Sequence, residues 1–113
     1  MLSFQKLDVY QRAISFLVLA VEAIASLPKG HSELAAQLRS SAQSTIANIA
    51  EGAGRRTRPD AAHHFFIARG SAMESAAHLD VMRAMGIVDE ATYARGIELL
   101  ERVVAMLTKM CDV

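Results

Sequence analysis

Apolar residues recur at steps of three and four along nearly the whole chain, in long segments separated by short breaks. Because an α-helix completes a turn every ~3.6 residues, such steps place the side chains on one face of a helix. The breaks contain Pro28, Gly30, Pro59 and Gly86, which are residues that end helices or relax the turn after them. The pattern predicts helices over about residues 7–27, 32–53, 60–85 and 89–111.

These expected helices are long and their connections are short, an arrangement that makes sequential helices antiparallel neighbours. We expect Ser32 and Asp60 to cap helix starts by accepting from free backbone N–H groups, and we expect the last helix to start at Asp89. Aromatic residues make up only 5% of the chain, so the core must be built mainly from aliphatic side chains and Met. The sequence therefore predicts an all-α protein, an antiparallel up-down-up-down four-helix bundle that forms one domain over residues 1–113.

Two of the helices carry more apolar surface than a single bundle core requires. The first has one stripe at Tyr10, Ile14, Leu17, Val21 and Ile24, and a second beside it at Ala13, Phe16, Ala20 and Ala23. The fourth likewise pairs a stripe at Tyr93, Ile97, Leu100, Val104, Leu107 and Cys111 with one at Leu99, Val103, Met106 and Met110. Surplus apolar surface is typical of proteins that associate, so we expect a homo-oligomer.

The third helix has an apolar face interrupted by a glycine. This face consists of Phe66, Gly70, Met73, Ala77, Val81 and Ala84. A glycine inside a helix costs about 1 kcal/mol relative to alanine, so its position needs a reason. Small residues gather around it at Ala68, Ser71 and Ala72. They predict a place where another helix approaches closely.

Charge and cysteine content limit the classes of function. The chain has 12 basic and 12 acidic residues, and a net charge of zero gives no whole-domain attraction to phosphates or membranes. The single Cys111 excludes an intrachain disulfide. The apolar run from Ile14 to Ile24 is short for a membrane span and contains Glu22, and the N-terminus lacks the pattern of a signal peptide. These features predict a cytoplasmic protein without membrane partners.

A polar stripe follows the second helix opposite its apolar side. Its members are Gln37, Ser41, Ser44, Asn48, Glu51 and Arg55, and the apolar side reads Leu34, Leu38, Ala42, Thr45 and Ile49. We interpret the stripe as a set of hydrogen bonds inside a helix interface, where polar groups set the register. A small-molecule or nucleic-acid site is the alternative. In the first case Asn48 and Glu51 are expected to be shielded from solvent and hydrogen-bonded.

The polar stripe leads into the one strongly basic segment, which contains Arg55, Arg56 and Arg58 beside Gly52 and Gly54. Arginines in such a loop can hold phosphate through bidentate hydrogen bonds, which makes them a candidate phosphate-binding site. No aromatic residues lie between them, so stacking on single-stranded bases has little support. The alternative is a solvated loop, or one that pairs with carboxylates of a neighbouring subunit. Nucleic acid is thus a possible partner that the neutral net charge does not favour.

Metal and catalytic sites have weak support. Glu74 and His78 share a helix face, but a di-iron bundle needs a Glu-x-x-His pair on each of two helices. No nucleophile elbow, metalloprotease signature or Cys–His pair with a base is present in the sequence. We therefore expect no metal, no cofactor and no catalytic residue, and a protein that is not an enzyme. A site assembled across subunits is the alternative that one sequence leaves open.

Several motifs resemble those of the bacterial four-helix-bundle family named after the 23S ribosomal RNA intervening-sequence protein. They lie at Phe4-x-x-Leu7-x-Val9-Tyr10-Gln11-x-Ala13, Leu27-Pro28, Gln37-x-Arg39, Ser44-x-x-x-Asn48-Ile49-Ala50-Glu51-Gly52-x-x-Arg55, Ile67-Ala68-x-Gly70-Ser71-x-x-Glu74, Leu79 and Gly86. The resemblance covers about residues 4–88, and the last helix matches only in pattern. His64 and Ser75 depart from the family, which commonly has Phe and Leu there.

The resemblance implies a four-helix bundle that assembles into a ring-like homopentamer. Relatives in this family act as accessory proteins of diversity-generating retroelements, where they are basic and contact nucleic acid and a reverse transcriptase. Two functions follow as hypotheses. The first is a non-enzymatic homo-oligomeric scaffold or interaction protein, and the second is a nucleic-acid-binding accessory protein that uses Arg55, Arg56 and Arg58.

Overall fold

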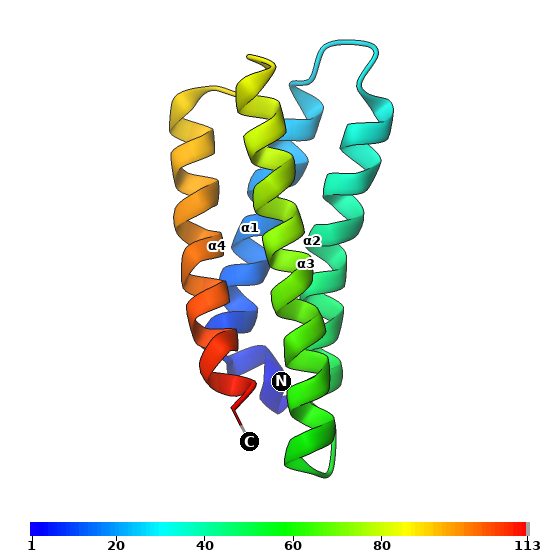
Figure 1. Cartoon of the computed structure of the whole chain (residues 1–113), viewed down its shortest axis with the longest axis vertical. Helices are drawn as coiled ribbons and strands as arrows, with labels where there is room; N and C mark the ends of the chain where they lie inside the picture. Colours follow the sequence, from blue (N-terminus) through cyan, green and yellow to red (C-terminus); the bar gives the residue numbers. More distant parts are fainter. Residues whose placement is uncertain (113) are drawn as a thin grey trace.

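The computed structural model describes residues 1–112 and contains four long helices (Figure 1). A short 3-10 helix, Ser3–Lys6, precedes them. The long helices are α1 (Asp8–Ala25), α2 (Ser32–Ala53), α3 (Arg58–Ala84) and α4 (Glu90–Met110). They form an elongated body of 45 × 24 × 22 Å. The expected all-α fold and the helix positions are confirmed, with each end within about two residues of its predicted place.

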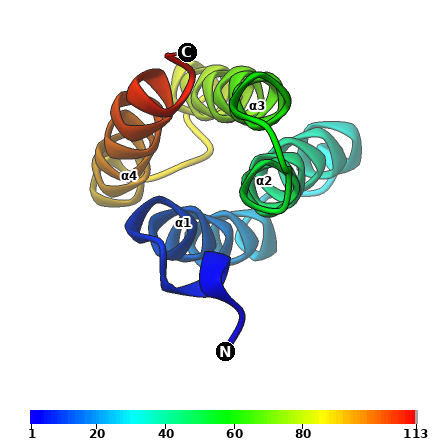
Figure 2. The same ribbon diagram turned by 90° about the horizontal axis from the view of Figure 1, so that it is seen from below.

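The helices follow one another around the bundle. Each long helix packs on the helices before and after it, α4 packs on α1, and the backbones of the diagonal pairs lie farther apart within residues 1–112 (Figure 2). The start of the chain, the end of α4 and the α2–α3 connection lie at one end, and the other two connections lie at the opposite end (Figure 1). This is the up-down-up-down arrangement that the short connections predict.

The helix starts differ in detail from the predicted caps. The hydroxyl of Thr57, not the Asp60 carboxylate, caps α3 by accepting a hydrogen bond from the Asp60 backbone N–H at 3.3 Å. Asp60 lies in the first turn, because Pro59 fits that turn and the helix therefore starts earlier. Ser32 is the first residue of α2 and follows the cap position. Asp89, the expected first residue of the last helix, lies just before α4 and caps it, accepting from Thr92 N–H at 2.7 Å.

The core buries different parts of the apolar stripes on different helices, and on α4 it takes Leu99 and Val103 from one stripe and Leu100 and Leu107 from the other. On α1 the stripe of smaller side chains, with Phe16 among them, is fully buried, whereas Val21 on the neighbouring stripe is exposed. On α3 the buried face runs through Phe65, Ala68, Leu79 and Met82, one step around the helix from the face that contains Phe66. None of the helices in the described part of the chain is long and apolar enough to span a membrane.

Two glycines differ in their surroundings. A Cβ atom on Gly52 would lie 2.5 Å from Cε1 of Phe65, so this glycine allows α2 and α3 to approach closely near their connection. A Cβ atom on Gly70 would meet nothing within 4 Å, because Gly70 faces outward. The expected close approach therefore applies within the chain to Ala68, Ser71 and Ala72, and no contact in the described residues explains Gly70.

Candidate functional site

The middle of the polar stripe on α2 pairs with polar side chains of α3. Ser41 Oγ and Ser75 Oγ are 2.7 Å apart in the buried interior, and Ser44 Oγ and Ser71 Oγ are 2.8 Å apart. Nearer the connection, Asn48 Oδ1 lies 3.3 Å from Nδ1 of His64. These three contacts form a ladder between antiparallel helices, and we call them the α2–α3 polar ladder.

The local hydrogen bonds assign most donors in the ladder. Ser41 donates its only hydroxyl hydrogen to the Leu38 carbonyl at 3.1 Å, so Ser75 must donate to Ser41. Asn48 Nδ2 donates to the Ser44 carbonyl at 2.9 Å, which turns its Oδ1 toward α3 as the acceptor for His64 Nδ1–H.

Every buried side-chain N or O atom in the described residues has a partner. The ladder therefore satisfies its own polar groups and sets the register of α2 against α3 without a ligand.

The ends of the polar stripe turn away from α3. Gln37 and Glu51 are exposed, with Gln37 bonded to Glu33 and Glu51 paired with Arg55 at 3.0 Å. The members of the polar stripe are separated by a mean step of about 3.5 residues. The stripe therefore drifts by about 20° per heptad around a straight helix, and its ends leave the interface with α3. The expectation that Glu51 is shielded is wrong for the single chain, whereas Asn48 is half-buried and hydrogen-bonded.

Two of the three loop arginines are tethered within the chain. Arg55 pairs with Glu51, and Arg58 donates to the backbone carbonyl of Asp112 at 3.3 Å. Arg56 is exposed and makes no ion pair with any residue between 1 and 112. The Arg58–Asp112 contact joins residues far apart in the chain, so no local pattern could reveal it.

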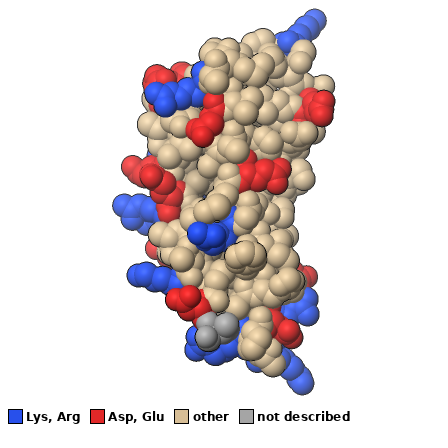
Figure 3. Space-filling view, in the orientation of Figure 1, with Lys and Arg blue, Asp and Glu red and all other residues tan. Residues whose placement is uncertain are grey.

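Charge is unevenly distributed along the bundle although the chain is neutral overall. Basic side chains gather at the end that contains the α2–α3 connection (Figure 3). There the basic residues are Lys6, Arg12, Arg55, Arg56, Arg58 and Lys109, and the acidic ones are Asp8, Glu51, Asp60 and Asp112. This end has excess positive charge, and the rest of the bundle carries the compensating negative charge.

A broad apolar face of α3 points away from the bundle, and we call it the outward α3 face. Its residues are Phe66, Ile67, Gly70, Met73, Ala77, Val81 and Met85. Phe66 is 61% exposed and Met85 is 51% exposed. The surface over α3 is largely uncharged in Figure 3. Large exposed side chains at helical spacing over several turns are typical of an interaction surface rather than of scattered surface residues.

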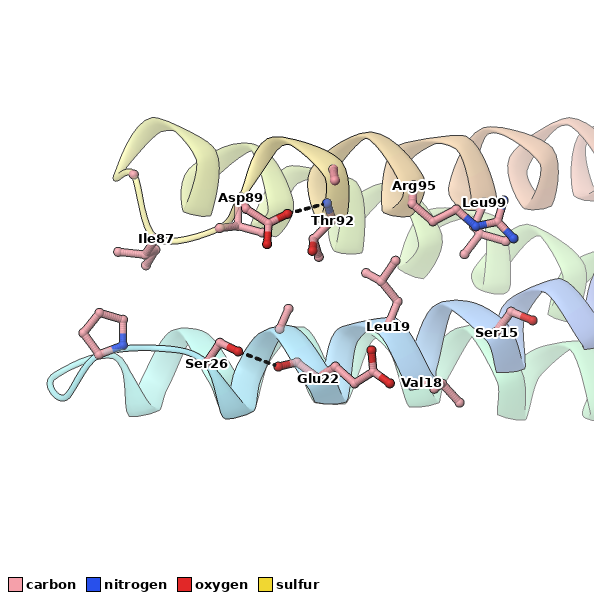
Figure 4. A pocket seen from close by; sticks show the side chains of 15 residues that line it. Ser15, Val18, Leu19, Glu22, Ser26, Ile87, Asp89, Thr92, Arg95 and Leu99 are labelled. Carbon is pink, nitrogen blue, oxygen red and sulfur yellow. Dashed lines mark hydrogen bonds between the residues drawn. The ribbon is translucent and has the colours of Figure 1, made fainter.

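An open groove of about 860 Å³ lies between the second half of α1 and the first half of α4 (Figure 4). Leu19 projects between the two helices, and Val18 lines the groove from α1. Two charged lining residues already have partners: Asp89 caps α4, and Arg95 pairs with Glu98. The hydrogen bonds from Thr92 lower the pKa of Asp89, as expected for a capping carboxylate.

No group of three or more His, Cys, Asp or Glu side chains is placed to hold a metal ion in residues 1–112. Glu74 and His78 contact each other at 3.2 Å across one turn of α3, and no third His, Cys, Asp or Glu side chain joins them. Burial raises the pKa of the Cys111 thiol, which disfavours the reactive thiolate.

Comparisons with known proteins are consistent with this fold. The chain is similar to the crystal structure of a protein with unknown function from the S23 ribosomal protein family of Bacteroides thetaiotaomicron VPI-5482. The two share 20% sequence identity with a TM-score of 0.83, over 93% of this chain and 99% of that one. No curated protein matches the chain. The family model described as 23S rRNA-intervening sequence protein matches residues 5–109, and thus also the helix whose sequence resembles the family only in pattern. The chain therefore belongs to the 23S rRNA-intervening sequence protein family.

Proposed function

We propose that this protein is a non-enzymatic homo-oligomeric scaffold that assembles through the outward α3 face. The observation that carries the proposal is the exposure of Phe66, Met73 and Val81 on one face of a helix whose opposite face is fully packed. Covering these side chains would contribute about 25 cal/mol per Å² of apolar surface removed from water. The neutral net charge supports the same proposal, because it lowers the repulsion between copies.

The proposed assembly is a homopentamer. This number of subunits rests on the family resemblance and not on the geometry of the single chain. A scaffold function agrees with the α2–α3 polar ladder, whose buried polar atoms are occupied by hydrogen bonds within the chain.

Light scattering after size-exclusion chromatography tests the self-assembly. The unmodified chain at micromolar concentration is expected to elute with the mass of a multimer, and Met73→Glu should shift it toward the monomer because a buried charge without a partner is costly. Val18→Glu is a matched control, since Val18 is 54% exposed on a different helix. A monomeric mass for the unmodified chain would contradict the proposed self-assembly.

A second candidate function is nucleic-acid binding through the basic end of the bundle. Arg56 is exposed without an ion-pair partner in residues 1–112, and basic side chains outnumber acidic ones around it. Assembly would place several copies of this loop in one particle, and multivalency raises the strength of individually weak sites. Binding would depend on phosphate contacts and show little sequence preference.

Binding to a structured RNA and a DNA duplex at two salt concentrations tests this candidate. Affinity is expected to fall steeply as salt rises, and replacing Arg55, Arg56 and Arg58 together with alanine should remove most of it. Arg95→Ala with Arg102→Ala provides a control on α4, away from the basic end. Salt-insensitive binding, or binding that survives the triple variant, would point to another surface.

A further inference from the structure

The face of α2 that points away from the bundle differs from the outward α3 face in shape. We call it the outward α2 face, and its residues are Ala36, Ser40, Gln43, Ala47, Ala50 and Gly54. These side chains are small or uncharged. Near the α2–α3 connection they surround a shallow hollow of about 620 Å³, lined by Ala47, Ala50, Glu51, Gly54 and Arg55. The outward α2 face is therefore flat with a hollow, whereas the outward α3 face carries projecting side chains.

The hollow and the most exposed aromatic side chain lie at the same height along the bundle. The contact between Asn48 and His64 shows which residues of α2 and α3 are level. Phe66 lies two residues beyond His64, which is about 3 Å along the axis, and the helices are antiparallel. Phe66 is therefore about level with Ile46, one residue from Ala47 at the edge of the hollow.

The two faces also have complementary charges at their edges, about halfway along the bundle. Glu74 is the one carboxylate bordering the middle of the outward α3 face, and its partner is His78. Arg39 is exposed at the edge of the outward α2 face and pairs with no acidic residue between 1 and 112. The contact between Ser41 and Ser75 places Arg39 and Glu74 about 4.5 Å apart in height, at 1.5 Å per residue. Arg39 lies on the side of its face nearer α1 and Glu74 on the side of its face nearer α2, so the two long side chains must span this offset and also reach across the contact.

We propose that the outward α3 face of one copy packs on the outward α2 face of the next copy, with Phe66 in the hollow and Glu74 paired with Arg39. This inference rests on the self-assembly proposed above and assigns the surfaces that make the contact. A rotation axis parallel to the bundle keeps residues at equal height in contact, as the matching positions require. The absence of a side chain at Gly70 then allows the two helices to approach closely.

The positions of the two faces also determine how the assembly closes. Because α2 and α3 are neighbours in the bundle, their outward faces diverge by roughly a right angle, and a head-to-tail contact between them closes after about four or five copies. Pairing of two α3 faces across a two-fold axis is disfavoured, because it would bring Glu74 near Glu74 of the other copy. Pairing of α3 with the diagonal α1 would instead produce an open filament.

Disulfide cross-linking between two different variants tests the contact. Cys111→Ala removes the native thiol, and Ser40→Cys and Ala77→Cys then place new thiols on the two faces in separate chains. Ser40 and Ala77 are exposed, small and nearly level, because Ser41 contacts Ser75. Mild oxidation of the mixed variants is expected to give a disulfide-linked dimer with one chain of each kind. Each variant alone should give none, because a head-to-tail contact does not bring identical residues together.

The same samples separate this inference from the proposed self-assembly. A multimeric mass without the mixed disulfide overturns the α2–α3 contact and leaves self-assembly intact, as does a disulfide-linked dimer of Ala77→Cys alone. A monomeric mass for the Cys111→Ala parent and for the unmodified chain overturns both.

Charge reversal provides an independent measurement. Arg39→Glu and Glu74→Arg should each raise the concentration needed for half-assembly by about tenfold, because each puts like charges together at every contact. The double variant should return it to the unmodified value. Glu101→Arg on the exposed side of α4 is the control and should have no effect. A double variant as weak as either single one would rule out the Arg39–Glu74 pair.

Discussion

At the residue scale, two positions that depart from the family's common residues form contacts of the polar ladder. Ser75 donates to Ser41 in the buried interior, and His64 donates to Asn48. Two antiparallel helices with small apolar side chains can slide past each other by a turn at little cost in packing. Hydrogen bonds between buried hydroxyls oppose such a shift, because a slip would leave polar groups unpaired. The ladder therefore stabilises one register of α2 and α3.

Single and double substitutions in the polar ladder are expected to have unequal effects on stability. Ser41→Ala removes the acceptor of the buried Ser75 hydroxyl and should lower the free energy of unfolding by about 1–3 kcal/mol. Adding Ser75→Ala removes the orphaned hydroxyl, so the double variant should be more stable than the sum of the two single effects indicates. Urea denaturation of the four proteins measures the difference. If the changes in the free energy of unfolding of the two single variants added up to that of the double variant, the two hydroxyls would not interact.

At the element scale, the start of α4 is held by charged and aromatic side chains as well as by its cap. Tyr93 donates to Asp80 at 2.6 Å, and the Arg83 guanidinium lies 4.5 Å from the centre of the Tyr93 ring and pairs with Glu90. The hydrogen bond to Asp80 raises the pKa of Tyr93, because it favours the neutral phenol. These contacts join the end of α3 to the start of α4, which orients the last helix hairpin.

The Asp89 cap predicts a dependence of stability on pH. Its folded pKa is lowered by the hydrogen bonds from Thr92, so the cap's contribution is present above the unfolded pKa near 3.8 and is lost as pH falls through the folded value. The stability difference between the unmodified chain and Asp89→Ala should therefore be constant near neutral pH and shrink in acid. Denaturant titrations at several pH values measure it. The same difference persisting at pH 2 would show that the ionised carboxylate is not what stabilises the start of α4.

At the whole-molecule scale, charged and apolar residues are concentrated on different parts of the elongated bundle, although the composition of the chain is balanced. Excess positive charge lies at the end with the α2–α3 connection, although the whole chain is neutral. The apolar outward α3 face and the small-residue outward α2 face lie side by side along the bundle. A ring formed by these two faces around an axis parallel to the bundle would bring all copies of the basic end to the same rim. The proposed assembly and the second candidate function are thus compatible.

Gly70 distinguishes the fold of one chain from its assembly. A side chain here would meet nothing within 4 Å in the chain, so Gly70→Ala should raise the stability of the monomer by about 1 kcal/mol through helix propensity. The added methyl group should at the same time weaken the close contact between copies. Thermal unfolding at low protein concentration and light scattering at high concentration measure the two effects. If Gly70→Ala raised both the stability of the monomer and the strength of assembly, this would argue against a helix of another copy lying over Gly70.

The sequence alone determined the number of helices, their approximate ends and the antiparallel order, because helical periodicity and helix-ending residues act over a few positions of the chain. It also identified Ser41, Ser44 and Asn48 as a polar stripe that could face another helix. Only the tertiary structure decided that this helix is α3 and that the hydroxyls of Ser71 and Ser75 complete the ladder. It likewise decided that the α3 face with Phe66 points outward while the face with Phe65 forms the core. Adjoining apolar stripes on one helix have the same local pattern, and the positions of the other three helices select the stripe that is buried.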